Sequence, residues 1–173
     1  MKQIATKAFT LVELLIVIGI IGILAVTLLL NLNPAEIQKK ARDSARIKDL
    51  VTLQAAVEQC LGDNLCANMH EDSTDGNTGT RCDSNWTGIN LCTYLKTVPI
   101  DPRNAQSITY VHSDGSNVAN TGRYRLHIIS GNYKISTLLE SVSNRSKVGN
   151  DGGTQAVNSP AYYEVFSDPA VGV

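Results

Sequence analysis

The chain has 173 residues, which is enough for one domain with one hydrophobic core. Its formal net charge is -1 and its Lys and Arg residues form no basic tail, so nucleic-acid binding, which needs a concentrated basic surface, is disfavoured. Apolar residues are concentrated in the first thirty positions, whereas Asn, Ser, Thr and Gly fill the remainder. The composition therefore indicates two regions that need different environments.

Residues 9–32 form the first predicted element, a membrane-spanning helix. They are apolar apart from two glycines and four polar residues, Thr10, Glu13, Thr27 and Asn31. A helix of this length crosses a hydrocarbon core of ~30 Å. Lys2 and Lys7 precede it, as in the basic start of a secretory signal. The simplest interpretations are a cleaved signal peptide or a plain membrane anchor.

Glu13 argues against both simple interpretations, because it lies only a few residues into the apolar run. An isolated carboxylate in hydrocarbon is costly and persists in membrane helices mainly where it has a partner. A plain anchor has no use for such a group. We therefore expect Glu13 to bind a partner of opposite charge.

The block Lys7-Ala8-Phe9-Thr10-Leu11-Val12-Glu13-Leu14 resembles the class III signal of type IV pilins and type II secretion pseudopilins. The resemblance implies that residues 1–8 are a leader peptide, that cleavage falls between Ala8 and Phe9, and that the new N-terminal Phe9 is N-methylated. The family usually has Gly where this chain has Ala8, another small residue. The resemblance also implies that Glu13 attracts the α-amine of a neighbouring subunit, a pairing that offsets part of the desolvation cost of both groups.

Gly19 and Gly22 place two small residues three apart on the same helix. Small residues let helices approach closely in a membrane or a filament core, although Gly is also common in membrane helices generally. The resemblance implies that this region loosens during assembly, which weak helix formers permit. The family's frequent mid-segment proline is absent and Pro34 follows the apolar run instead. Loosening would therefore centre on Gly19, Gly22 or Pro34.

Residues 33–61 are predicted to form an amphipathic helix. Its apolar positions recur at steps of three and four: Ile47, Leu50, Leu53, Val57 and Leu61. Joined to the apolar run it makes one rod from Phe9 to Leu61, in which Pro34 introduces a kink because proline removes a backbone donor.

The head, residues 62–173, is predicted to hold a loop region at 62–100, with a short helix at 93–96, and an irregular C-terminal tail. Three β-rich segments lie between them, at 108–112, 123–129 and 133–138. The predicted fold class is therefore α+β, with a long N-terminal helix packed on an antiparallel sheet of about three strands. This is the pilin architecture, and residues 94–140 also loosely resemble the head of major pseudopilins.

The four cysteines, Cys60, Cys66, Cys82 and Cys92, lie at the end of the second helical segment and in the loop region. An even count in an exported, loop-rich segment predicts two disulfides, for which three pairings exist. We favour Cys60 with Cys66 and Cys82 with Cys92, because each pair closes a short local loop. A zinc site is the alternative, but the spacing contains no Cys-x-x-Cys motif and no regular His partner.

The resemblance to major pseudopilins leaves calcium open as a ligand, and residues 151–153, Glu164 and Asp168 supply the oxygen atoms that calcium prefers. Their spacing matches no defined pattern, so no ligand is assigned, no cofactor is predicted and solvated turns are favoured. His70-Glu71-Asp72 is interpreted as a solvated loop. The sequons at Asn85 and Asn144 are interpreted as chance matches.

No catalytic motif is present, because the chain has no Gly-x-Ser-x-Gly elbow, P-loop or His-Glu-x-x-His. The resemblance implies a structural subunit, not an enzyme, whose partners are prepilin peptidase, an inner-membrane assembly platform with its ATPase, the membrane, and copies of itself or related pilins. A surface type IV pilus and a short type II secretion pseudopilus both remain open.

The resemblance implies a single-pass protein of the cytoplasmic membrane with an extracytoplasmic head. The cluster Lys39, Lys40, Arg42, Arg46 and Lys48 opposes this topology under the positive-inside rule, but the leader and the cysteines favour it. One alternative is a membrane-anchored extracytoplasmic binding module that does not polymerise. Another is an exported soluble protein that loses the whole apolar run as a signal peptide.

Overall fold

The computed structural model describes residues 9–31, 33–73, 79–112, 115–153 and 162–168. The predicted leader, including Ala8, lies outside these residues. The chain divides into two compact units, residues 1–37 and residues 38–173, which are described separately.

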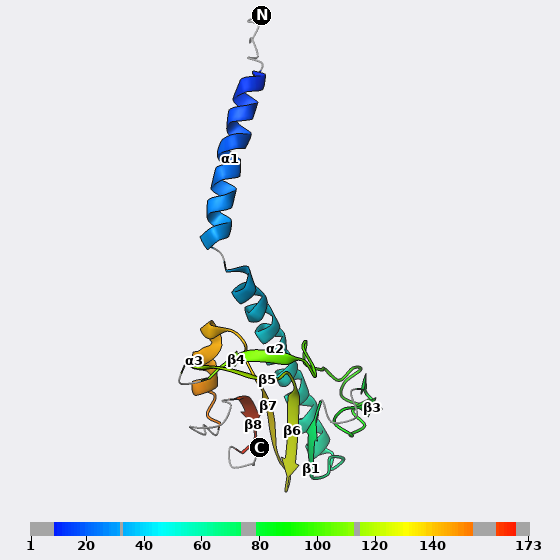
Figure 1. Ribbon diagram of the computed structural model, residues 1–173. Helices are drawn as coiled ribbons and strands as arrows, with labels where there is room; N and C mark the ends of the chain where they lie inside the picture. Colours follow the sequence, from blue (N-terminus) through cyan, green and yellow to red (C-terminus); the bar gives the residue numbers. More distant parts are fainter. Residues whose placement is uncertain (1–8, 32, 74–78, 113–114, 154–161, 169–173) are drawn as a thin grey trace, which may run out of the picture. The chain divides into compact units, whose positions relative to one another are not determined.

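The N-terminal helical region consists of two helices, α1 at Leu11–Asn31 and α2 at Pro34–Gly62 (Figure 1). The sequence predicted one rod with a kink at Pro34, whereas the structure begins a separate helix at this proline. The Asn33 side chain accepts from the amide of Glu36 at 3.2 Å, as an N-cap does, and Pro34 is the first residue of α2. Proline fits this position because its missing N–H would have no helical partner there, and the residue before a proline disfavours helical geometry.

The head is built on a four-stranded antiparallel sheet with the strand order β1-β6-β7-β8. Its strands are β1 at Met69–Asp72, β6 at Tyr124–Ile129, β7 at Asn132–Thr137 and β8 at Tyr163–Phe166. Pairing of Leu126 with Ile135 and of Ile128 with Tyr133 puts these four side chains on one face. They form one buried cluster with residues of α2: Leu50, Leu53, Val57 and Cys60. This cluster is the main core.

The α+β fold class predicted from the sequence is confirmed: an apolar helix, a second helix and an antiparallel sheet follow one another. The turn between β6 and β7 consists of Ser130 and Gly131, with φ values of 53° and 82°. Two consecutive positive φ values match the twist of the flanking strands, which explains the tight hairpin.

The sheet differs in composition from the one predicted. The segment 108–112 does not join it: β4 at Ser107–Val111 pairs with β5 at Asn117–Thr121 in a separate two-stranded sheet. The outer strands β1 and β8 come instead from the predicted loop region and the predicted irregular tail. Both are only four residues long, too short to show a clear alternating pattern in the sequence.

The remaining elements are short. They are β2 at Thr80–Arg81, β3 at Ser84–Asn85, the 3₁₀ helix η1 at Val142–Asn144 and α3 at Arg145–Gly149. The short helix predicted at 93–96 is absent, and a turn takes its place. The amides of Tyr94 and Leu95 both donate to the carbonyl of Leu91 at 2.8 Å, and no regular helix continues from this turn.

A buried ion network joins α2 to two distant loops of the head. Arg46 is fully buried and binds Asp101 at 2.8 Å, Asp43 at 3.0 Å and Glu140 at 2.7 Å. Arg42 donates two further bonds to Glu140, at 2.9 and 2.7 Å. The opposite charges compensate one another inside the protein. Because Arg42 and Arg46 lie on α2, their bonds to Asp101 and Glu140 hold the loops around these two residues against α2.

Candidate functional site

Helix α1 has the length and composition to cross a membrane over Leu11–Leu29, as predicted for the apolar run. Its large apolar side chains have no cover within the described chain: exposure ranges from 45% at Val17 to 80% at Leu11. An apolar surface of this extent needs lipid or another protein against it.

The start of α1 is fixed by reciprocal hydrogen bonds between Thr10 and Glu13. The amide of Glu13 donates to the Thr10 hydroxyl oxygen at 3.2 Å, while Glu13 Oε2 accepts from the Thr10 amide at 3.1 Å. This arrangement is a capping box, which satisfies two amides that helix geometry leaves without partners. The Thr-x-x-Glu spacing in the sequence is the signal for this box, although the role predicted for Glu13 rested on its charge alone.

The capping box leaves part of Glu13 available for a further partner. Both bonds from Thr10, from its amide and from its hydroxyl, end on the same oxygen, Oε2. A carboxylate has two oxygens and accepts about four hydrogen bonds, so Oε1 can accept from a group outside the chain. Capping and charge pairing by Glu13 are therefore compatible.

Gly19 and Gly22 line a shallow groove on α1 of about 390 Å³, together with Ile18, Ile23, Val26 and Thr27. A Cβ atom built at either glycine would meet nothing within 4 Å. Packing among the described residues therefore gives no reason for glycine at these positions, although each glycine costs a helix about 1 kcal/mol relative to alanine. Pro34, the third residue expected to loosen the helix, lies outside α1.

The four cysteines form the two pairs favoured from the sequence, Cys60–Cys66 and Cys82–Cys92. The first closes the C-terminal end of α2, where Cys60 is fully buried in the main core. The second closes the loop after β2. Neither pair is arranged as the four-cysteine zinc site considered as the alternative.

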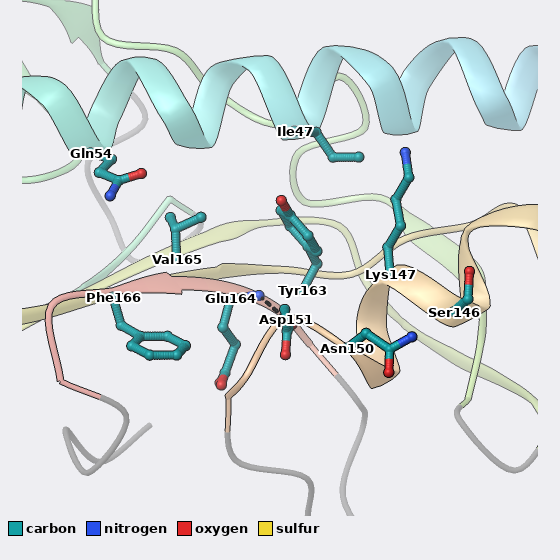
Figure 2. A pocket seen from close by; sticks show the side chains of 10 residues that line it. All are labelled: Ile47, Gln54, Ser146, Lys147, Asn150, Asp151, Tyr163, Glu164, Val165 and Phe166. Carbon is teal, nitrogen blue, oxygen red and sulfur yellow. Dashed lines mark hydrogen bonds between the residues drawn. The ribbon is translucent and has the colours of Figure 1, made fainter.

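A surface cleft of about 630 Å³ in the head contains part of the predicted calcium set (Figure 2). It is lined by Ile47 and Gln54 of α2, by Asp151, and by Glu164 of β8. Asp151 accepts from the amides of Gly153 at 3.0 Å and Glu164 at 2.9 Å. Burial raises the pKa of Asp151 against the opposing effect of these amides.

The acidic residues considered for calcium, for which no ligand set was assigned, have partners within the protein. Glu164 lies 3.7 Å from the ammonium of Lys134, and both side chains are 2% exposed. This buried cation balances the charge of Glu164, and both Asp151 oxygens accept backbone amides. Asp168 follows β8. Asp151 and Glu164 therefore have protein partners of their own, and no role for calcium follows from them.

His70-Glu71-Asp72 is not a solvated loop, because it forms most of strand β1. Asp72 is 4% exposed and binds Arg123 at 2.7 Å and Arg125 at 3.4 Å. The sequon residues Asn85 and Asn144 are also buried and hydrogen-bonded, which is not the surface setting of a glycan acceptor. These three segments therefore have structural explanations.

Comparison with known proteins finds one match, to a family model for an N-terminal motif. The family model for the prokaryotic N-terminal methylation motif matches residues 5–29, which include Glu13 and both glycines of the α1 groove. No curated protein and no solved structure matches the chain. The matched motif supports a pilin- or pseudopilin-like precursor, and the apolar helix fits a membrane anchor for it. The chain therefore carries near its N-terminus the prepilin-type signal of type IV pilins and pseudopilins.

Proposed function

We propose that this protein is a structural subunit of a type IV pilus-like or type II secretion pseudopilus filament. Prepilin peptidase cuts it between Ala8 and Phe9, and Phe9 is then N-methylated. The observation that carries the proposal is the methylation motif at residues 5–29, combined with a carboxylate in the first turn of an exposed apolar helix. The role is structural and not enzymatic.

Glu13 steers assembly in this proposal. Cleavage before Phe9 leaves Thr10 and Glu13 in the mature chain, so the capping box is retained. The new α-amine of a neighbouring subunit then binds the available Oε1 of Glu13. Pairing these two charges in an apolar surrounding offsets part of the desolvation cost of each.

The groove at Gly19 and Gly22 gives the packing surface. In the membrane α1 faces lipid, and in the filament its exposed side chains pack against α1 of related subunits or of other copies. Glycines permit close backbone approach there, which explains why they are used although packing among the described residues gives no reason for them. An assembly platform in the inner membrane, driven by its ATPase, transfers the helix between these two environments.

The head lies outside the cytoplasm in the proposed topology. Two disulfides support this, because disulfides persist in oxidising compartments and are rare in the cytosol. The assembled subunit is then at the cell surface or in the periplasm.

Processing is tested by the intact mass and N-terminal sequence of the membrane-extracted protein, made with and without a prepilin peptidase. We expect a peptidase-dependent product that begins at Phe9 and is one methyl group heavier than the unmodified chain. A chain that stays uncut with the peptidase, or that begins after Asn31, contradicts the proposal. The second of these results would favour an exported soluble protein.

Two matched substitutions separate the charge of Glu13 from its capping role. Glu13→Gln retains the capping box, in which glutamine also serves, but removes the charge. Thr10→Val removes the two bonds made by the hydroxyl, and with them the cap on the Glu13 amide, but retains the charge. We expect Glu13→Gln to be processed normally yet to form few or no filaments by electron microscopy, whereas Thr10→Val still assembles.

The opposite pattern would assign Glu13 a capping role only. If both variants are processed normally but the parent protein itself forms no filaments, the alternative is favoured, a membrane-anchored binding module. Membrane extraction and immunoblotting check that each variant is inserted in equal amount, so that loss of filaments is not loss of protein.

A further inference from the structure

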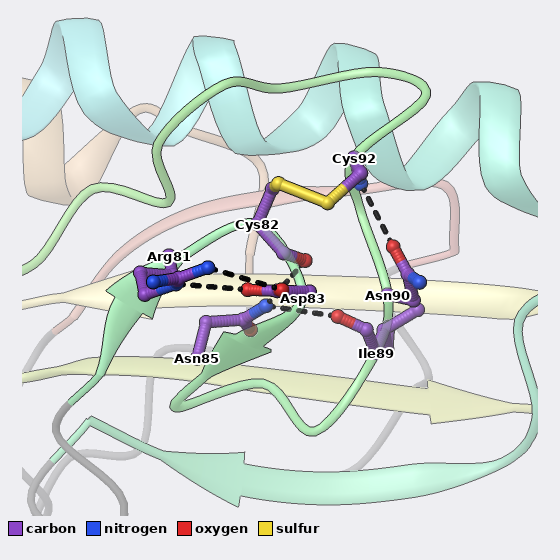
Figure 3. Close-up of a disulfide and its surroundings, with 7 residues drawn as sticks. All are labelled: Arg81, Cys82, Asp83, Asn85, Ile89, Asn90 and Cys92. Atoms are coloured by element: carbon purple, nitrogen blue, oxygen red, sulfur yellow. Dashed lines mark hydrogen bonds and ion pairs between the residues drawn. A yellow bond between two sulfur atoms is a disulfide. The ribbon is translucent and has the colours of Figure 1, made fainter.

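We propose that Cys82, Cys92 and Asp83 form a redox-gated site for a thiophilic divalent cation of the zinc class. One oxygen of the Asp83 carboxylate and the two sulfur atoms all lie within 4.8 Å of one another. Figure 3 shows the disulfide together with Arg81 and Asp83. In the oxidised protein the sulfurs bind each other, so the metal site exists only after this disulfide opens. The inference is independent of the filament role.

The two disulfides differ in their accessibility. Cys92 is exposed and Cys82 is partly exposed, whereas Cys60 is fully buried and Cys66 is partly exposed and packs against the main core. Thiol–disulfide exchange requires a thiolate to reach a sulfur atom along the disulfide axis. The Cys82–Cys92 bond is therefore the one that an external thiol reaches first.

The loop between Cys82 and Cys92 is held by bonds other than the disulfide. The Cys82 carbonyl accepts from the Leu91 amide at 2.8 Å and from the Asn85 side chain at 3.1 Å. The buried Trp86 indole donates to the Pro99 carbonyl at 2.8 Å. These contacts keep the two Cα atoms, now 4.6 Å apart, close together after reduction.

The three donors suit zinc. Thiolates bind zinc at about 2.3 Å and carboxylates at about 2.0 to 2.2 Å, so two sulfurs around a tetrahedral ion lie about 3.8 Å apart. The Cα atoms, 4.6 Å apart, leave both sulfur atoms close enough for this separation once the disulfide has opened. Asp83 must leave Arg81, from which it lies 3.1 Å away, but their ion pair is exposed and contributes little. Arg81 then offsets the remaining negative charge.

The chemistry balances with a dithiol as the reductant. Its two thiols become a disulfide, and two electrons and two protons pass to the Cys82–Cys92 bond, which gives two thiols. Each thiol releases its proton when it binds the cation, and Asp83 binds as a carboxylate. Water takes the fourth position.

The first part of the test uses the full chain in detergent micelles, treated with limiting dithiothreitol, trapped with N-ethylmaleimide and analysed by peptide mass. We expect Cys82 and Cys92 to be labelled at least about tenfold faster than Cys60 and Cys66, because exchange follows access to the sulfur. Simultaneous opening of both disulfides, or faster opening of Cys60–Cys66, would overturn the gating.

In the second part the reductant is removed under anaerobic conditions and Cd²⁺ alone is added. Binding is measured by the ultraviolet charge-transfer absorbance of thiolate–cadmium bonds, and competition with Zn²⁺ then measures binding of zinc. Binding should appear only after reduction and should be lost in Cys82→Ser/Cys92→Ser. Asp83→Asn should weaken it at least about tenfold, the loss typical of removing even an outer-shell partner. Asp63→Asn, an exposed carboxylate beside the other disulfide, is the matched control. Equal affinity in Asp83→Asn and the parent, or no binding after reduction, would overturn the site.

Discussion

Helix α1 and the head differ in where their side chains find contacts. In the head, apolar residues of α2 and the sheet bury one another, and even Arg46 is fully enclosed by three carboxylates. In α1 the polar groups near the start are satisfied by the box between Thr10 and Glu13, but the apolar side chains remain exposed. The head is therefore stabilised by contacts within itself, whereas the apolar surface of α1 needs lipid or another protein against it.

This difference assigns the two regions different kinds of sensitivity. Substitutions inside the head should change its free energy of unfolding, because they break contacts made within the chain. Substitutions in α1 should leave that free energy unchanged and act on insertion or assembly. One pair of substitutions, with one member in each region, tests this division directly, and substitutions at buried charges measure how far the head depends on contacts within the chain.

The largest effect on the head is expected for Arg46→Ala. The substitution leaves Asp43, Asp101 and Glu140 buried without their common partner, and breaking a buried ion pair from one side costs about 3 to 5 kcal/mol. The free energy of unfolding of the head is measured by urea unfolding of the detergent-solubilised chain, monitored by the fluorescence of Trp86. The control is Arg81→Ala, which breaks an exposed pair with Asp83 and should leave unfolding almost unchanged. Equal effects of the two substitutions would contradict the structural role of the buried network.

The same leucine substitution in the two regions gives the most direct comparison. Leu53 is 1% exposed in the main core, so Leu53→Ala should lower the free energy of unfolding of the head by about 2 to 5 kcal/mol. Leu24 is 57% exposed on α1, and Leu24→Ala should leave head unfolding unchanged. A clear destabilisation of the head by Leu24→Ala would show that α1 belongs to the cooperative unit of the head.

A smaller effect is expected for the pH dependence of head stability. Burial acts to raise the pKa of Glu140, but the hydrogen bonds and charges of Arg42 and Arg46 outweigh it, so the pKa lies below its ordinary value of 4.5. A lowered folded pKa means that this stabilisation is complete above 4.5 and is lost as the pH falls through the folded value.

Glu140→Gln should therefore flatten the unfolding free energy below pH 4.5 relative to the parent protein. Urea unfolding at a series of pH values on both sides of this point measures the difference, which isolates Glu140 from the other carboxylates. An identical pH profile in both proteins would remove Glu140 from the acid response.

Sequence patterns predicted the fold where they were long or chemically distinctive. The apolar run, the step of three and four in α2, and the alternation of Tyr124, Leu126 and Ile128 correspond to α1, α2 and β6. Short elements escaped prediction, because β1 and β8 have four residues each and acquire their strand character from the neighbours they pair with. The polar segment 70–72 shows this well, since Asp72 is buried by Arg123 and Arg125.

The sequence by itself determined the prepilin-type signal, the spanning length of the apolar run and the favoured cysteine pairing, because these depend on neighbouring residues along the chain. Only the tertiary structure decided that Lys134 pairs with Glu164 and that Arg46 unites carboxylates from three segments. Such contacts join residues far apart in the chain, and burial determines which charges must be paired.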